Sequence, residues 1–210
     1  MTPNKEDYLK CIYEIGTDMQ KITNKEIAAR MQVSPPAVTE MIKRMKSENL
    51  LLKDKENGYL LTDIGLKLVS ELYRKHRLIE VFLVHHLDYT SDQIHEEAEV
   101  LEHTVSDLFV KRLDKLLGFP QTCPHGGTIP AEGELLVEIN NLPLAAVQEA
   151  GTYLLTRVHD SFELLKYLEK HAIHIGDQLQ VKQFDGFSNS FTLVNKDEDL
   201  QVSMDIAKQL

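Results

Sequence analysis

A helix–turn–helix pattern followed by a hairpin signal restricts the fold of this chain more than any other feature of the sequence. Thr23 is followed three residues later by Glu26, which is the capping-box signature of a helix start. After a short turn, Ser34 is a suitable N-cap for a second helix with an apolar stripe at helical spacing. That stripe consists of Val38, Met41, Ile42 and Met45. Strand-forming residues then flank Asn57-Gly58, the strongest short hairpin signal, which gives the order of a winged helix-turn-helix.

The rest of the chain is predicted to be helical in the middle and to contain strands near its C-terminus. An amphipathic helix over Glu6–Ile15 comes first, and a long helix begins at Asp63. Two shorter helices are expected at Thr90–Glu97 and Val100–Leu116, followed by the Pro- and Gly-rich loop LGFPQTCPHGGTIPAEGEL. The segments TYLLTRVH, QLQVKQF and FTLVN, with a helix over Ser161–His171, predict a small β-barrel. The expected fold class is mainly α with a small β component.

The composition is that of an ordinary globular protein, with 42% hydrophobic and 27% charged residues. Its apolar runs are too short to span a membrane, and MTPNKEDYLK lacks the hydrophobic core of a signal peptide. The two cysteines, Cys11 and Cys123, are too few for a disulfide framework. We therefore expect a cytoplasmic protein in a reducing compartment, with no membrane partner.

The net charge of −10 is distributed unevenly along the chain. Of the 23 Lys and Arg residues, 13 lie in residues 1–75, where 11 of the 33 Asp and Glu residues also lie. The remaining 10 basic and 22 acidic residues lie in residues 76–210. The first third can therefore approach a polyanion, whereas the rest is repelled unless cations neutralise some of its acids.

The helix-turn-helix segment carries side chains that suit duplex DNA. The candidate DNA-contacting residues are Ser34, Pro36, Ala37, Thr39, Lys43, Arg44, Lys53 and Lys55. The apolar members suit thymine methyl groups and the lysines suit phosphates, and the start of the second helix is expected to direct free N–H groups at phosphate. The alternative is a generic small helical domain whose lysines only solvate its surface. The hairpin and the charge distribution together favour DNA.

Acidic and histidine side chains recur on shared helical faces in the middle of the chain. In the stretch HEEAEVLEH, His95, Glu99, Glu102 and His103 fall on one side of a helix, whereas Glu96 points elsewhere. Carboxylates this close repel one another, which suggests a cation between them. The full set of candidate ligands is Asp7, His76, Glu80, His95, Glu99, Glu102, His103, Cys123, His125 and Asp160.

Each of these residues also has an ordinary explanation when it is taken alone. His76 and Glu80 form a possible surface pair one turn apart, and Asp160 is a possible helix N-cap. Cys123 could be a small buried hydrophobe. Because acidic and histidine residues recur on the same helical faces, it is improbable that all of the ordinary explanations hold together. Carboxylate and imidazole donors with a single thiol suit Mn²⁺ or Fe²⁺, since a structural zinc site is richer in thiolates.

Catalysis is not indicated by the sequence. It contains no zinc-protease helix, no pair of Glu-x-x-His motifs on this face, and no Ser/His/Asp or phosphate-loop signature. We therefore expect no enzyme and no small-molecule substrate. The rival from another class is a metal-dependent hydrolase, which would need an open coordination position and a general base. The β-barrel could in addition bind a peptide, and redox sensing through Cys123 is a weaker alternative.

These features in combination resemble one family over essentially the whole chain. They are the winged helix-turn-helix, the pair His76/Glu80, the E-x-x-E-H run at Glu99–His103, the loop CPHGGTIP and the terminal barrel. The family is the diphtheria toxin repressor family of metal-dependent regulators, and in particular its streptococcal-type manganese-responsive branch with three domains. The resemblance implies a winged helix-turn-helix DNA-binding domain over 1–72, a helical metal-binding and dimerisation domain over 73–140, a linker over 141–150, and an SH3-like β-barrel over 151–210.

The resemblance also implies a function and two sets of ligands. A metal-loaded homodimer would bind a palindromic operator in double-stranded DNA, usually to repress metal-uptake genes. The regulatory site would consist of Glu80, Cys123, His125 and Asp160. The second site would consist of Asp7, Glu99, Glu102 and His103, with His76 as a further ligand. His95 aligns with a ligand of the iron-responsive relatives, and its role here is left open.

Two departures from the family pattern bear on the metal. Two-domain manganese regulators have a second carboxylate three residues after the first-helix aspartate, where this chain has Lys10, so their compact binuclear site is not expected. Iron-responsive members have a cysteine where this chain has Glu99, and the harder donor favours Mn²⁺. An iron-responsive regulator stays the alternative, because intrinsic affinity for Fe²⁺ exceeds that for Mn²⁺. Zn²⁺ or Cd²⁺ is expected to bind in vitro.

Overall fold

The computed structural model describes residues 4–17, 21–90, 93–139, 142–196 and 198–210. Its first elements are α1 (Lys5–Thr17), α2 (Asn24–Arg30), α3 (Pro35–Ser47), β1 (Leu51–Asp54), β2 (Gly58–Leu61) and α4 (Asp63–Leu87). The middle contains α5 (Ile94–Glu102) and α6 (Asp107–Leu116). The last part contains η1 (Leu144–Ala146), β3 (Gly151–Leu154), α7 (Phe162–Lys170), β4 (Gln178–Asp185), β5 (Ser190–Asn195), β6 (Glu198–Ser203) and α8 (Met204–Ala207).

The chain forms two compact units, and the boundary falls within α4. The first unit comprises residues 1–76 and 130–137, and the second comprises residues 77–129 and 138–210. Because α4 is continuous across the boundary, His76 and Glu80 are one turn apart on a single helix. The predicted division into four segments is neither confirmed nor contradicted by this grouping, and the units are described separately below.

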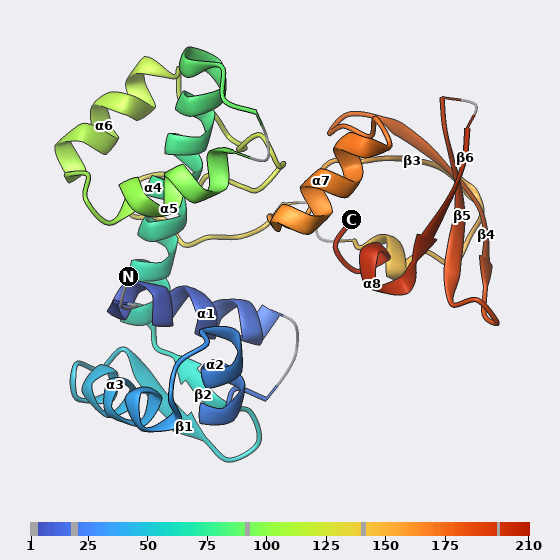
Figure 1. The fold of residues 1–210 in the computed structure, drawn as a ribbon. Coiled ribbons are helices and arrows are strands. Elements are labelled where there is room, and N and C mark those ends of the chain that lie inside the picture. The colour runs from blue at the N-terminus through green and yellow to red at the C-terminus, as the bar shows by residue number, and fades with distance from the viewer. Residues whose placement is uncertain (1–3, 18–20, 91–92, 140–141, 197) are drawn as a thin grey trace. The chain divides into compact units, whose positions relative to one another are not determined.

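In the first unit, α1, α2, α3 and the β1–β2 hairpin gather around the beginning of α4 (Figure 1). Apolar residues from each of these elements share one core, which includes Ile12, Ile27, Met45, Leu51 and Val69. The predicted order of two helices and a hairpin is confirmed. The hairpin pairs antiparallel, with Leu51 opposite Leu61.

Local capping explains why the two helices begin where they do. Thr23 accepts a hydrogen bond from the N–H of Glu26, as the capping-box pattern predicts. Ser34 caps α3, with Pro35 at the first helical position. The hairpin turn is held against the residues before α2, because a side chain at Gly58 would place its Cβ 2.0 Å from the Ile22 carbonyl oxygen. The positive φ of 86° at Gly58 also favours glycine.

In the second unit, the later turns of α4 pack against α5 and α6 around Leu78, Ile79, Leu83, Ile94 and Leu113. The predicted helix over Val100–Leu116 is wrong. Instead, α5 continues to Glu102, and α6 begins only at Asp107.

The break between α5 and α6 has a local cause. Ser106 is in an extended conformation, and its hydroxyl accepts a hydrogen bond from the N–H of Phe109, which makes it the N-cap of a new helix. The predicted start of α5 at Thr90 is replaced by Ile94, and residues 91–92 between them lie outside the described residues.

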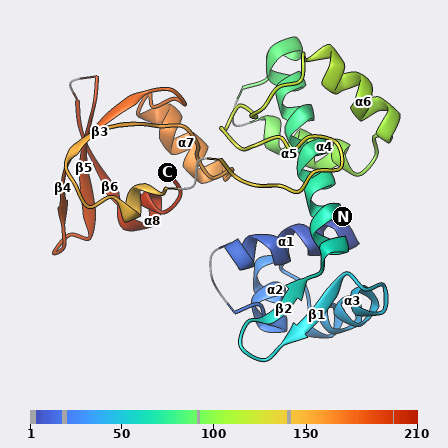
Figure 2. The same cartoon turned by 180° about the vertical axis from the view of Figure 1, so that it is seen from behind.

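The C-terminal part is a four-stranded antiparallel sheet in the order β3-β4-β5-β6, of the SH3-like type. Helices α7 and α8 lie on the inner side of the curved sheet (Figures 1 and 2). Leu165 of α7 shares a core with Val181, Leu193 and Val202 of the strands. Strand β6 was not predicted, because the segment EDLQVS is mostly polar and buries only Val202 fully. The predicted fold class is confirmed. Among the described residues, no helix combines the length and apolar character needed to cross a membrane.

Candidate metal centre and DNA-binding surface

The exposed side of α3 carries side chains predicted to contact DNA. Thr39, Lys43 and Arg44 are all exposed on this helix. Lys53 on β1 and Lys55 in the following turn are exposed as well. Cations on the outer side of a helix and on an adjoining hairpin are the arrangement expected for phosphate contacts. These five side chains are therefore accessible to a duplex.

The start of α3 differs from the prediction that free N–H groups would meet phosphate there. Pro35 and Pro36 have no N–H group. The N–H of Ala37 donates to Ser34 Oγ over 3.4 Å, and that of Val38 donates to the Ser34 carbonyl oxygen over 3.2 Å. The prediction is wrong, because the first positions of this helix either lack an N–H or use it for their own cap. The exposed surface of Pro36 and Ala37 is apolar instead.

Three donor residues from distant segments come together in the second unit. Glu80 lies on α4, whereas Cys123 and His125 lie in the loop after α6. Each offers one ligand atom, and these atoms lie within 4.8 Å of one another. All three residues are buried, and Glu80 is only 1% exposed. Burial of a carboxylate beside a thiol and an imidazole costs free energy unless something compensates the charge.

The loop that carries Cys123 and His125 is closed by its own backbone. The N–H of Cys123 donates to the Gly127 carbonyl oxygen and the N–H of Gly126 donates to the Cys123 carbonyl oxygen, both over 2.9 Å. A Cβ at Gly126 would lie 1.9 Å from the Thr156 carbonyl oxygen, and its φ of +79° favours glycine. The Gly-Gly pair after His125 therefore allows the loop to approach the strand-to-helix segment closely.

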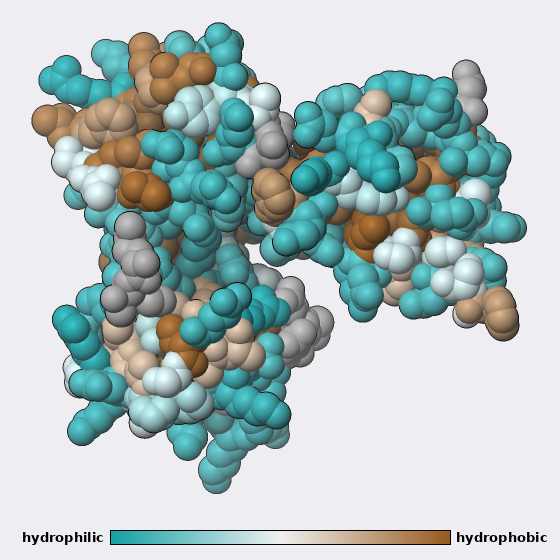
Figure 3. All heavy atoms as spheres, viewed as in Figure 1, coloured by the Kyte–Doolittle hydropathy of each residue, from teal (hydrophilic) through white to brown (hydrophobic). Residues whose placement is uncertain are grey.

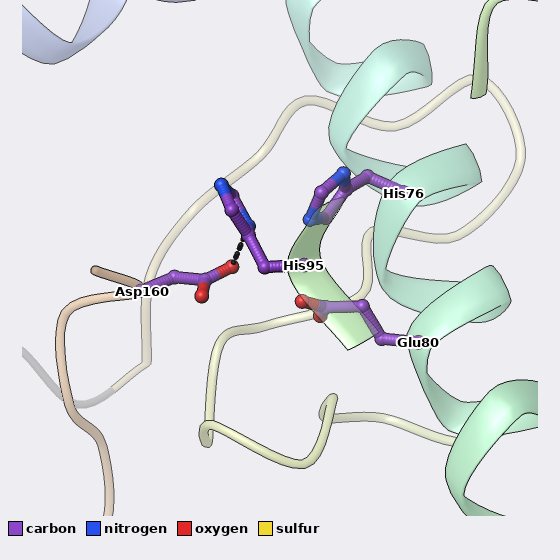
Figure 4. A group of neighbouring side chains, drawn as sticks. All are labelled: His76, Glu80, His95 and Asp160. Carbon is purple, nitrogen blue, oxygen red and sulfur yellow. Dashed lines mark hydrogen bonds and ion pairs between the residues drawn. The ribbon is translucent and has the colours of Figure 1, made fainter. Parts of the chain in front are cut away.

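Asp160 and His95 adjoin this buried group. His125 Nδ1 lies 3.3 Å from Glu80 Oε1 and 3.5 Å from Asp160 Oδ1. Asp160 Oδ2 also lies 2.8 Å from His95 Nδ1. Figure 4 shows His95 and Asp160 pointing toward each other, with His76 and Glu80 on successive turns of α4. The four residues of Figure 4 offer ligand atoms within 4.8 Å of one another. The structure thus places His76 and His95 beside Glu80 and Asp160.

The electrostatics of the buried donors favour a cation among them. Burial raises the pKa of the Cys123 thiol well above its ordinary value, and the negative charge of Glu80 raises it further. Burial by itself lowers the pKa of His125, but the carboxylates of Glu80 and Asp160 outweigh this effect, so its pKa lies above the ordinary value. Both carboxylates therefore attract positive charge to this point.

The residues present fit a divalent metal ion. Both ring nitrogens of His125 are buried, and neither makes a hydrogen bond within the described part of the chain. A buried imidazole of this kind is expected when one of its nitrogens serves as a metal ligand. Two carboxylates, an imidazole and one thiol form a donor set that accommodates Mn²⁺, Fe²⁺ or Zn²⁺.

The other predicted ligands lie on α1 and around the end of α5. Asp7 belongs to the first unit, and its Oδ2 accepts a hydrogen bond from the N–H of Asn4 over 2.6 Å, next to the start of α1. In the second unit, Glu99 is exposed and its Oε1 lies 3.4 Å from His95 Nε2. Glu102 is buried, with Oε1 3.4 Å from Nε2 of His103, the C-cap of α5. Glu99 and Glu102 thus belong to one helix with His103 as its C-cap, but Glu99 is exposed whereas Glu102 is buried.

A buried ion pair that the sequence did not indicate lies against the loop that carries Cys123 and His125. Arg77 Nη2 lies 2.6 Å from Glu138 Oε1, and Arg157 Nη2 lies 3.2 Å from the same oxygen. Glu138 Oε2 accepts the N–H of Thr128 over 3.0 Å, and Arg77 Nη1 donates to the Thr128 carbonyl oxygen. Gly127 lies against the Arg77 guanidinium, since a Cβ there would be 2.7 Å from its Cζ. The only sequence signal was Arg77 directly after the candidate ligand His76.

A second unanticipated feature is an apolar surface over α5 and α6 (Figure 3). Its exposed large hydrophobic residues are Val100, Leu108, Phe109, Leu116 and Phe119. Side chains of this size that remain exposed together mark an interaction surface.

Comparison with known families assigns each part of the chain. Residues 1–59 match "Iron dependent repressor, N-terminal DNA binding domain", and residues 62–131 match "Iron dependent repressor, metal binding and dimerisation domain". Residues 142–210 match the FeoA domain. The diphtheria toxin repressor of Corynebacterium diphtheriae is 27% identical, with 96% of this chain and 93% of that protein covered.

Solved structures similar to this chain include one described as a manganese regulator and one described as a manganese-activated repressor. The manganese regulator SloR is 59% identical with a TM-score of 0.91, and the comparison covers 100% of this chain and 97% of SloR. ScaR with bound Cd²⁺ is 63% identical with a TM-score of 0.95, over 99% of this chain and 97% of ScaR. The metal-dependent transcriptional regulator MtsR is 57% identical with a TM-score of 0.89, over 100% of this chain and 98% of MtsR.

A winged helix-turn-helix, a dimerisation domain and a buried set of candidate metal ligands are those of a metal-responsive transcriptional repressor, which binds DNA, dimerises and is not an enzyme. More narrowly, the chain belongs to the diphtheria toxin repressor family, in its streptococcal manganese-type branch. The family resemblance seen in the sequence is confirmed.

Proposed function

We propose that this protein represses metal-uptake genes when Mn²⁺ is available, by binding a palindromic operator in double-stranded DNA as a metal-loaded homodimer. The observation that carries the proposal is the convergence of Glu80, Cys123 and His125, whose ligand atoms lie within 4.8 Å in a buried position. Such a group is costly to bury without a cation, so its presence in a chain that also contains a DNA-binding domain favours control by metal.

The regulatory site is proposed to consist of Glu80, Cys123, His125 and Asp160. A cation bound there would supply the positive charge that offsets the two carboxylates and holds the loop donors in place. Asp160 lies between β3 and α7, so its carboxylate would fix the start of the barrel helix against α4 and the loop. His95, which contacts Asp160 over 2.8 Å, would orient that carboxylate.

A second set of ligands is proposed from the family resemblance. It consists of Asp7, Glu99, Glu102 and His103, with His76 as a further ligand. His76 also adjoins Glu80, so a role in orienting the regulatory site competes with the one inferred from the family. The proposed segments stay those expected from the sequence, with the DNA-binding part over 1–72, the metal-binding and dimerisation part over 73–140, the linker over 141–150 and the barrel over 151–210.

Manganese is the metal we propose, and iron is the alternative. ScaR is described as a manganese-activated repressor and SloR as a manganese regulator, and ScaR also binds Cd²⁺ and Zn²⁺ in crystals. The carboxylate-rich donor set suits the hard Mn²⁺ ion. Fe²⁺ binds the same donor types with higher intrinsic affinity, so titration with Fe²⁺ under anaerobic conditions distinguishes the two regulators.

The proposed dimer contacts are the exposed apolar residues over α5 and α6. Burying Leu108, Phe109 and Leu116 against a second copy would remove a large hydrophobic surface from water. Two recognition helices would then meet half-sites about one helical turn apart or a multiple of it. If Mn²⁺ binding favours this spacing, DNA binding in turn tightens Mn²⁺ binding, because the coupling between the two is reciprocal.

The test is selection of genomic fragments by the purified protein at fixed salt, once with Mn²⁺ and once with chelator. Enrichment of a palindrome only with Mn²⁺ is the expected result. Equal enrichment in both conditions would leave a DNA-binding protein whose metals are structural, and no enrichment in either would reject operator binding.

Two substitutions assign the roles of individual residues. His125→Ala is expected to weaken Mn²⁺ binding and Mn²⁺-stimulated DNA binding while the dimer stays intact, whereas the exposed His174→Ala serves as the matched control. Lys43→Ala is expected to weaken binding to all sequences and to reduce the salt dependence by about one counterion. An effect of Lys43→Ala at one base position only would reassign it to base readout.

A further inference from the structure

The hydroxyl group of Thr39 on the recognition helix is engaged on both sides by the protein itself. It donates a hydrogen bond to the Pro35 carbonyl oxygen over 3.0 Å, one turn earlier in α3. It also accepts a hydrogen bond from Asn24 Nδ2 of α2 over 2.9 Å. A threonine hydroxyl has only one proton to donate, so it cannot donate to a base or a phosphate without giving up the bond to Pro35.

These two bonds occupy the polar part of an exposed side chain. Thr39 is exposed, although its oxygen is tied to the backbone of α3 and to α2. The γ-methyl group is therefore the part of the Thr39 side chain that these two bonds leave unengaged. Thr39 follows the exposed apolar residue Pro36 by three residues, so the two lie on the same side of α3.

We propose that Thr39 reads the C5-methyl group of a thymine in each operator half-site, and that Asn24 is the positioning residue that holds the methyl group outward. This inference rests on the proposed binding of operator DNA. The residues of a recognition helix near its N-terminus meet base edges in the major groove, and the thymine methyl is the apolar group exposed there.

The free energy expected from one methyl contact sets the expected change in DNA affinity. Removing one buried methyl group changes affinity about fourfold, which corresponds to about 0.8 kcal/mol when 1.4 kcal/mol is tenfold. A hydroxyl that read a base by hydrogen bonding would show a different pattern, because it would respond to the donors and acceptors of the base and not to its methyl group.

The experiment uses the full-length, Mn²⁺-loaded protein and the operator duplex that it selects from a randomised library. Each thymine of the operator is replaced in turn by uracil, which removes the methyl group and leaves base pairing unchanged. For the wild-type protein, uracil at one position of each half-site is expected to lower the affinity about fourfold. The position is assigned to Thr39 when this loss of affinity disappears in Thr39→Ser. That variant keeps the hydroxyl and both hydrogen bonds but lacks the methyl group.

Two further variants separate positioning from general effects on binding. Asn24→Ala removes the donor that holds the Thr39 hydroxyl, so the thymine-to-uracil ratio should fall at the Thr39 position and stay unchanged elsewhere. Lys25→Ala removes an exposed cation from the neighbouring position of the same helix and is expected to weaken binding to thymine and uracil operators equally.

The outcomes distinguish this inference from the proposed function. If no operator is selected, operator binding fails and the inference fails with it. If an operator is selected but Thr39→Ser keeps the wild-type thymine-to-uracil ratio at every position, the role of the Thr39 methyl group is rejected while operator binding stands. A ratio that Asn24→Ala leaves unchanged would reject the positioning role of Asn24.

Discussion

Replacing Glu138 by glutamine removes one negative charge from a buried group of cations without changing the volume of the side chain. In the structure, Glu138 Oε1 contacts Arg77 over 2.6 Å and Arg157 over 3.2 Å, while Oε2 accepts the N–H of Thr128 over 3.0 Å. A glutamine oxygen that faces the arginines turns its NH₂ group toward the N–H of Thr128. Two donors then face each other in a site where the Arg77 side chain is 8% exposed and that of residue 138 is 13% exposed.

The cost of this change follows from the burial of the pair. Removing one partner of a buried ion pair costs roughly 3–5 kcal/mol, because the remaining charge is left without compensation. We expect about 3 kcal/mol, at the lower end of this range. Arg77 keeps its bond to the Thr128 carbonyl oxygen, and the Arg157 side chain is 30% exposed and regains some hydration.

The assay is urea unfolding of the chelator-treated protein, with Glu134→Gln as the matched control. Glu134 is an exposed acid four residues earlier, and its substitution is expected to change the free energy of unfolding by less than about 0.5 kcal/mol. A Glu138→Gln variant as stable as this control would refute the role given to the Arg77–Glu138 pair. Mn²⁺ affinity should also fall in Glu138→Gln, because Thr128 belongs to the loop that follows His125.

The pH dependence gives an independent check on the same residue. Burial alone would raise the pKa of Glu138, but Arg77 and the N–H of Thr128 outweigh it, so its pKa lies below the ordinary value. The Glu138 carboxylate therefore stabilises the fold fully at pH values above its unfolded-state pKa of about 4.3. This stabilisation is lost as the pH falls through the folded-state pKa. The stability difference between wild type and Glu138→Gln should therefore shrink below about pH 4.

Three further changes test the cap, the loop and the thiol. Thr23→Ala removes the hydrogen bond to the N–H of Glu26 and should cost about 1 kcal/mol in urea unfolding. Gly126→Ala would place a Cβ 1.9 Å from the Thr156 carbonyl oxygen, so calorimetric titration should show Mn²⁺ affinity reduced roughly 10- to 100-fold. Because burial raises the pKa of Cys123, Mn²⁺ binding should release its proton, and the apparent affinity should rise from about pH 6 to 8. An affinity independent of pH would exclude Cys123 as a thiolate ligand.

The parts of the fold that the sequence predicted correctly depend on contacts between residues close together in the chain. Thr23 and Ser34 cap their helices through N–H groups three residues later, and the hairpin near Gly58 needs only its own turn. The same kind of signal exists at Ser106, but the apolar periodicity of residues 100–116 obscured the break that it makes. Strand β6 carries too few apolar residues to be recognised alone, and it is fixed by its antiparallel pairing with β5.

The candidate site shows the same division between local and distant contacts. The sequence supplied the donor types and the one-turn spacing of His76 and Glu80. It did not supply the contact of His95 with Asp160, whose side chains are 65 positions apart in the chain. Nor did it indicate that Glu138 pairs with Arg77, 61 positions away.

The sequence by itself determined the types of secondary structure, the family and the chemical character of the candidate metal ligands, because these follow from residue types and from spacings of a few residues. Only the tertiary structure decided which donors share one buried position and which charges brace them. Those contacts join α4, the loop around His125 and the segment at Asp160. Bringing segments so far apart in the chain together costs conformational entropy, which only the packing of the whole unit offsets. The hydroxyl of Thr39 follows the same rule, since its orientation depends on α2 as well as on its own helix.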